Sequence, residues 1–124
     1  MIAPQEVIEE KMKQVVRMGN YEAAYLFSGE GLYIAKATAR EEVDPERLAE
    51  ISMLFNDVKR LAITLGGIER LQEVFLEGVN HRKVIFRFFI AFGEEVVLAA
   101  VIPPRKPYRK HTNALQKLIH TFEF

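Results

Sequence analysis

Cysteine is absent from this chain of 124 residues. Its absence excludes a disulfide framework, a zinc–thiolate site and a thiol nucleophile. No apolar run approaches the roughly 20 residues that a membrane-spanning helix needs. The amino-terminal segment is charged at Glu6, Glu9, Glu10, Lys11 and Lys13, unlike a secretory signal. These absences predict a cytoplasmic protein that does not bind membranes.

An excess of charge of either sign is also missing. Seventeen basic residues balance seventeen acidic ones, so the net charge predicts no attraction to nucleic acid or to anionic lipid. The hydrophobic share of 49% is typical of a globular protein, and no repeat, low-complexity tract or linker divides the chain. We therefore expect one domain over residues 1–124, which buries about two-thirds of its unfolded surface.

The hydrophobic patterns predict three helices and five strands in the order α-β-β-α-β-β-β-α. The predicted helices are Pro4 to Met18, a long one that Asp44-Pro45-Glu46 opens and Gly66-Gly67 closes, and about Lys110 to Phe122. The predicted strands are Tyr21 to Ser28, Leu32 to Thr38, Leu71 to Glu77, Val84 to Phe92 and Glu95 to Ile102. Short links between consecutive strands favour an antiparallel meander, and the helices can cover both of its faces.

Several local features of these elements are predicted from single residues. Alternation places Tyr21 on the same face of the first strand as Ala23, Tyr25 and Phe27. Two acidic residues on one face of Leu71 to Glu77 indicate a half-exposed edge strand. Gly93-Glu94 is expected to turn the chain, and Thr112 is expected to cap the last helix.

The second helix has the clearest pattern. Asp44-Pro45-Glu46 opens it and Gly66-Gly67 closes it. A continuous apolar stripe is formed by Leu48, Ile51, Phe55, Val58, Ala62 and Leu65. Leu54 and Leu61 lie beside that stripe, and Met53 lies outside it. Two interpretations stay open: a wide core face with stray surface residues, or contact of Leu54, Leu61 or Met53 with a second chain.

Four segments of the chain carry a family likeness. They are Gly31-Leu32-Tyr33-Ile34-Ala35, Asp44-Pro45-Glu46-Arg47-Leu48-Ala49, Leu65-Gly66-Gly67 leading into Val74-Phe75-Leu76-Glu77-Gly78, and Val96 to Ile102 before a terminal helix. In this order and spacing the sequence resembles the roadblock domains, which include dynein light chains and bacterial regulators of Ras-like GTPases. The likeness runs from about Tyr21 onward, and Pro4 to Met18 matches the family's first helix.

The resemblance implies an α+β fold of the roadblock/profilin-like kind. It consists of a five-stranded antiparallel sheet with the long helix on one face and the terminal helices on the other. It also implies a two-fold dimer in which the second helices pack together and the third strands meet edge to edge. The candidate dimer-interface residues are therefore Met53, Leu54, Leu61, Val74 and Leu76.

Members of the family generally serve as platforms without catalysis. The resemblance thus implies a cofactor-free module that pairs with itself or with a related roadblock chain and binds a small Ras-like GTPase. A structural adaptor without nucleotide-state preference is one alternative. A small-molecule sensor domain of related topology is another, but the large side chains of Phe55, Phe75, Phe86 and Phe88 argue for a filled interior.

The link before the last helix departs from the small, Gly/Asn-containing link expected of the family. Its basic residues, candidates for binding a partner, are Arg105, Lys106, Arg109 and Lys110. The alternative is a solvated loop whose charges pair with Glu94, Glu95 or Glu123. Arg87, in an otherwise apolar strand, is expected to form an ion pair or to contact a partner's carboxylate.

No pattern in the sequence indicates catalysis. The three histidines have no second ligand at metal-binding spacing, and adjacent acidic residues point in different directions on a helix or strand. We expect no catalytic, cofactor-binding or metal-binding residues, and hence no enzyme.

Overall fold

The computed structural model describes residues 4–39, 44–103 and 108–121. The helices are α1 (Pro4–Gly19), α2 (Pro45–Leu65) and α3 (Arg109–His120). The strands are β1 (Ala23–Ser28), β2 (Tyr33–Thr38), β3 (Glu73–Glu77), β4 (Lys83–Ala91) and β5 (Glu94–Ile102). The predicted order of elements is confirmed, and the predicted ends lie within about two residues of those observed.

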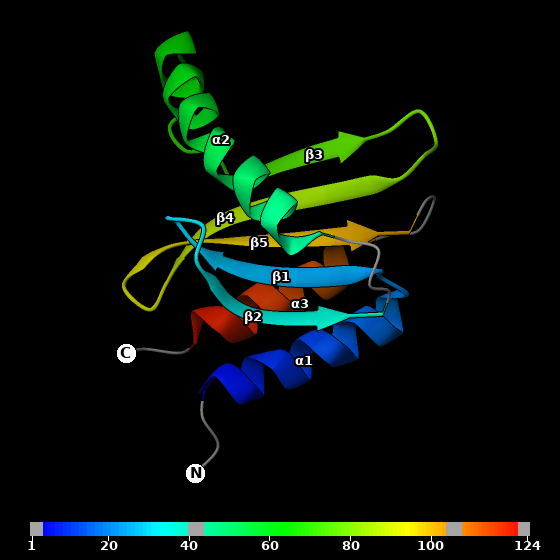
Figure 1. The fold of residues 1–124 in the computed structure, drawn as a ribbon. Coiled ribbons are helices and arrows are strands. Elements are labelled where there is room, and N and C mark those ends of the chain that lie inside the picture. The colour runs from blue at the N-terminus through cyan, green and yellow to red at the C-terminus, as the bar shows by residue number, and fades with distance from the viewer. Residues whose placement is uncertain (1–3, 40–43, 104–107, 122–124) are drawn as a thin grey trace.

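The five strands form one antiparallel sheet in the order β2-β1-β5-β4-β3. The last three strands form a meander, whereas β1 pairs with both β2 and β5. Consequently β2 and β3 are the two edges of the sheet (Figure 1). The prediction of β3 as an edge strand is confirmed.

Helices cover the two faces of the sheet unequally. On one face α1 and α3 pack side by side and bury residues such as Met12 and Ile119 against Leu26 and Leu98. On the other face α2 lies alone and buries Phe55 among the aromatic side chains of β4 (Figure 1). This confirms the predicted placement of the long helix on one face and the terminal helices on the other.

Local chemistry fixes both ends of α2. The Asp44 carboxylate accepts a hydrogen bond from the amide of Glu46 at 3.0 Å, and Pro45 occupies the first turn, where its missing N–H costs nothing. At the other end Gly66 has φ 94° and Gly67 has φ 79°, a conformation that glycine adopts without a steric penalty. The helix therefore begins and ends where the sequence indicates.

The turn between β4 and β5 differs from the prediction. It consists of Phe92 and Gly93, with φ values of 57° and 74°, while Glu94 is already the first residue of β5. Two consecutive positive φ values are those of the two-residue hairpin turn that matches the twist of the flanking strands. The expected Gly93-Glu94 turn is thus wrong by one residue.

Tyr21 also lies elsewhere than predicted. It precedes β1, and its ring packs in the core beneath α1 and α3 instead of sharing the face of Tyr25 and Phe27. Its hydroxyl donates a hydrogen bond to the carbonyl oxygen of Tyr108 at 2.8 Å and lies 3.0 Å from the Thr112 hydroxyl. Burial raises the pKa of Tyr21, which keeps the hydroxyl a donor.

Thr112 is not the cap of α3. Tyr108 occupies the cap position, and the Thr112 hydroxyl donates to the Tyr108 carbonyl oxygen at 3.0 Å from one turn inside the helix. The residue is almost completely buried. Its hydroxyl and that of Tyr21 together tie the start of α3 to the start of β1.

An ion pair holds the edge strand β3. Arg87 of β4 stands opposite Glu73 of β3, and its guanidinium lies 3.1 Å from the Glu73 carboxylate. The two side chains are only 11% and 22% exposed. Arg87 also donates to Asn113 of α3, and the Tyr108 hydroxyl donates to Glu73 at 3.4 Å. The predicted ion pair is confirmed, and it connects β3 to α3.

We predict that Arg87→Ala lowers the free energy of unfolding by about 2 kcal/mol, because Glu73 then stays half-buried without a cation. Arg47→Ala is the matched control, since Arg47 pairs with Glu50 at the same 3.1 Å but both side chains are mostly exposed. Its expected effect is under about 0.5 kcal/mol. Denaturant unfolding measures both, and equal losses would contradict the assigned role of Arg87.

Candidate functional site

All the buried residues of α2 lie in its first half. Its buried residues are Leu48, Ser52 and Phe55. None of the residues from 56 to 65, all of which the structure describes, is buried. Figure 1 shows this end of α2 projecting away from the sheet. The predicted continuous core stripe is therefore wrong beyond Phe55, where Val58 and Leu65 are exposed and Ala62 is only partly buried.

Exposed apolar residues follow one side of the projecting helix. Leu54, Val58, Leu61 and Leu65 are spaced by three or four residues, so their side chains share a stripe about 60° wide. Leu54 is 65%, Leu61 69% and Leu65 79% exposed. We name these four residues the α2 stripe. It is separate from the buried face of the helix, which lies about 100° around the axis.

Lys59 closes the edge of the core beneath the helix. Its ammonium lies 4.4 Å from the centre of the Phe88 ring and 3.9 Å from the Glu95 carboxylate. A cation over an aromatic face is stabilising, so Lys59 shields Phe88 from water where α2 leaves the sheet. Glu95 is one of the carboxylates that the alternative interpretation pairs with the basic link, most of which lies outside the described residues.

Met53 lies apart from the α2 stripe. About 100° separates it from Leu54 around the helix. Its side chain covers the β1–β2 turn, where a Cβ added at Gly31 would be 2.9 Å from the Met53 sulfur. The structure therefore brings Leu54 and Leu61 together but places Met53 over the hairpin.

Strand β3 adds an open edge to the same region. Its Val74 packs against the core beneath α2, and Leu76 faces the same side and is exposed. The carbonyl of Gln72 accepts from the Phe88 amide at 2.9 Å, so alternate residues from Gln72 bond to β4. The backbone groups of Glu73, Phe75 and Glu77 consequently face away from the sheet. We call the α2 stripe with Val74 and Leu76 the α2–β3 surface.

Phe75 is not part of the filled interior that the sequence predicts. It faces the α3 side of β3, is exposed, and stacks on Tyr108 with the ring centres 6.2 Å apart. The predicted burial of Phe55, Phe86 and Phe88 is confirmed. One aromatic side chain is thus left at the sheet edge, beside the outward-facing backbone.

The candidate basic residues are only partly described. Arg105 and Lys106 lie outside the described residues. Arg109 and Lys110 are exposed on the first turn of α3, with the Arg109 guanidinium 5.1 Å from the centre of the Tyr108 ring. They belong to the layer opposite α2, so these two residues and the candidate dimer-interface residues lie on different sides of the sheet.

Within residues 4–39, 44–103 and 108–121, no group of three or more His, Cys, Asp or Glu side chains could hold a metal ion. Across these same ranges, no helix combines the length and apolar character needed to cross a membrane. His81 lies 3.6 Å from the Glu77 carboxylate, and the His120 ring nitrogen lies 2.8 Å from the carbonyl oxygen of Ile90.

Comparison by sequence finds no matching family model and no matching curated protein. Comparison by structure finds several similar proteins. A gliding protein, MglB from Thermus thermophilus, is 20% identical, with a TM-score of 0.80 over 97% of this chain and 90% of that one. An MglB described with a tetrameric arrangement is 22% identical, with a TM-score of 0.77 over 96% and 92%.

A third similar structure is a Roadblock/LC7 domain from Streptomyces avermitilis. It is 16% identical, and the TM-score is 0.68 over 90% of both chains. Identities this low establish the fold alone, and the fold is the one that the sequence likeness implied. This chain has the roadblock fold.

Proposed function

We propose that this chain is a dimerising, cofactor-free interaction module that binds and regulates a small Ras-like GTPase without catalysis of its own. The observation that carries the proposal is the α2–β3 surface, an apolar helix stripe beside an open strand edge. The roadblock fold supports it, as does the tetrameric arrangement named for one similar MglB. A roadblock chain of different sequence is an alternative partner to a second copy.

Burial of the α2 stripe supplies the driving force for pairing. Each leucine moved from water into a packed interface contributes about 1.5–3 kcal/mol. Apolar patches of this kind on a folded protein mark interaction sites. A two-fold axis sets the same stripe and the same strand edge of each copy against each other, so one surface serves both partners.

The backbone of β3 restricts the register of such a pair. A symmetric antiparallel contact that uses the whole strand is centred on Phe75, whose amide and carbonyl face outward. Val74 then stands opposite Leu76 of the second copy, on the side that carries α2. Glu73 stands opposite Glu77 of the second copy, and Arg87 and His81 lie beside those carboxylates at 3.1 and 3.6 Å.

We predict that Leu61→Arg converts the dimer to a monomer, because the guanidinium would be buried unpaired in the interface. Ile63→Arg is the matched control, since Ile63 is also an exposed apolar residue but lies roughly opposite the stripe on the helix. Light scattering after size exclusion measures the mass of each variant. A monomeric wild-type protein at high concentration would refute the pairing.

The register has its own test. The chain has no cysteine, so Phe75→Cys introduces a single thiol. Opposed residues that exchange both hydrogen bonds have Cα atoms about 5.5 Å apart, within disulfide range. Mild oxidation should therefore cross-link Phe75→Cys quantitatively, whereas Val79→Cys, exposed beyond the end of β3, should react slowly. The reverse order of rates would contradict the register.

GTPase regulation requires different affinities for the two nucleotide states. We expect the dimer to bind the GTP-analogue and GDP forms of a Ras-like GTPase from the same cell with affinities that differ about tenfold. Titration calorimetry with each form measures the ratio. Equal affinities would favour the structural adaptor, and absence of binding to both forms would contradict the proposal.

The basic residues of the link belong to the same proposal. We include Arg105, Lys106, Arg109 and Lys110 as contacts to an acidic surface of the GTPase. Replacing all four by serine should weaken binding most at low salt, because exposed charges are screened as salt rises. Unchanged affinity at low salt would remove them from the contact.

A further inference from the structure

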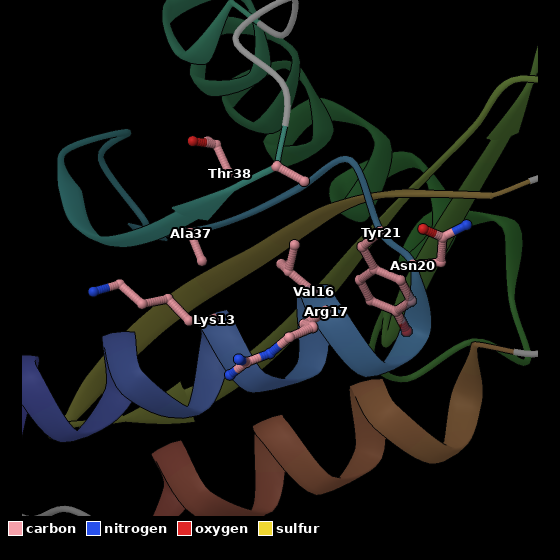
Figure 2. Close-up of a pocket in the computed structure, with 8 residues that line it drawn as sticks. Lys13, Val16, Arg17, Asn20, Tyr21, Ala37 and Thr38 are labelled. Carbon is pink, nitrogen blue, oxygen red and sulfur yellow. The ribbon is translucent and has the colours of Figure 1, made fainter.

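The second edge of the sheet, β2, borders a groove. The groove lies between β2 and α1 and has a volume of about 440 Å³. Figure 2 shows Val16 of α1 and Ala37 of β2 directed toward each other across it, while Thr38 is directed away from α1. Val16, Ala37 and the Tyr21 ring provide an apolar floor.

The backbone of β2 is open along this groove. The amide of Ala39 donates to the carbonyl oxygen of Glu22 at 2.8 Å, and Ala37 and Ala35 follow as alternate residues paired with β1. The amide and carbonyl groups of Lys36 and Thr38 therefore point away from the sheet. An extended segment laid along β2 would find these groups available for hydrogen bonds.

Basic side chains line the same groove. Lys13 and Arg17 are one helical turn apart on α1, and both line it (Figure 2). Lys36 adds a third cation on the opposite face of β2. Among the described residues, none of these three side chains has an ion pair or a hydrogen bond. Lys36 only approaches the Tyr33 ring, at 5.8 Å from its centre.

One acidic side chain of α1, Glu9, acts on Tyr33 toward the other end of β2. Burial raises the pKa of Tyr33, and the negative charge of Glu9 adds to this rise. Glu9 precedes Lys13 by one turn, so among the described residues the charge of α1 beside β2 changes from acidic near Tyr33 to basic at Lys13 and Arg17. A bound segment would place its own carboxylates at the Thr38 end.

We propose that the groove between β2 and α1 binds an acidic peptide segment, which adds to the sheet as a strand beside β2. The segment forms backbone hydrogen bonds with Lys36 and Thr38. Every second side chain of the segment faces α1, where Lys13 and Arg17 lie. This site is independent of the α2–β3 surface, which lies at the opposite edge of the sheet.

Charge and shape select this occupant over a second copy. Two β2 edges brought together would set the cations of both copies against each other, which disfavours self-pairing. Leu26 of β1 pairs with Ala35 and Phe27 with Tyr33, which leaves Ile34 as an extra residue in β2, so the regular part of β2 is only Ala35 to Thr38. A short acidic segment fits both restrictions.

The experiment measures fluorescence anisotropy of a labelled peptide of about eight alternating glutamate and valine residues. We expect saturable binding to the full chain and no binding of the corresponding lysine–valine peptide. Reversal of both charges, Lys13→Glu with Arg17→Glu, should weaken binding about tenfold. Arg70→Glu with Lys117→Glu, two exposed cations outside the groove, is the charge-matched control and should have no effect.

Thr38→Pro tests strand addition itself. It removes the outward amide that the peptide would use, but no hydrogen bond to β1, and proline is tolerated at such positions of an edge strand. Binding should be lost in Thr38→Pro and kept in Thr38→Val, with circular dichroism to confirm that both fold. Leu61→Arg should bind as the wild type does, which separates this site from dimerisation.

Three results would overturn the proposal. They are absence of saturable peptide binding to the wild type, equal binding of the lysine–valine peptide, and unchanged binding by Thr38→Pro. Vesicles of phosphatidylserine are tested in parallel. Capture by vesicles that depends on Lys13 and Arg17, without peptide binding, would assign the cations to a lipid surface instead.

Discussion

The central strands β1 and β5 are apolar on both faces, and this requires a covering layer on each side of the sheet. Every residue of β1, and every residue of β5 from Val96 to Ile102, is buried. On one side α1 and α3 together cover the sheet. The buried Tyr21 and Thr112 hydroxyls join the segment after α1 to the first turn of α3. On the other side a single helix must cover the sheet, and only the first half of α2 has residues buried against it. The incomplete second layer is the physical origin of the exposed apolar surface.

The ion pair between Arg87 and Glu73 stabilises β3, the edge strand of this surface, from the α3 side of the sheet. It holds β3 in register with β4 and links it to α3 through Tyr108 and Asn113. An edge strand of five residues would otherwise depend on one neighbouring strand for its position. With attachments to both β4 and α3, β3 presents its outward backbone groups at the edge of the sheet. The two layers of the molecule thereby contribute to one surface.

Much of the fold could be predicted because its determinants are local. The caps of α2 depend on Asp44, Pro45 and Gly66, and the central strands on uninterrupted apolar runs. Tyr21 could not be placed because alternation holds only inside a strand, and β1 begins two residues later. The exposure of Leu65 could not be predicted either, since helical periodicity identifies an apolar face without showing what covers that face. The single-domain prediction for residues 1–124 remains a prediction.

Part of the candidate site could also be predicted from local sequence patterns. Leu54 and Leu61 stood out because they widened the stripe beyond what a sheet contact requires. The contact of Met53 with Gly31 depends on how α2 crosses the hairpin, which no local pattern encodes. The groove beside β2 left no signal at all. Lys13 and Arg17 look like ordinary solvent-facing residues of an amphipathic helix until β2 is known to be an edge.

The two margins of the sheet are chemically unlike, and this bears on how far assembly can proceed. The β3 edge is short, regular in register and flanked by leucines. The β2 edge has a shifted register and carries positive charge. Head-to-tail growth of a continuous sheet requires the β3 edge of one molecule to pair with the β2 edge of the next. The shifted register of the β2 edge disfavours this contact, which favours closed particles over open-ended fibrils.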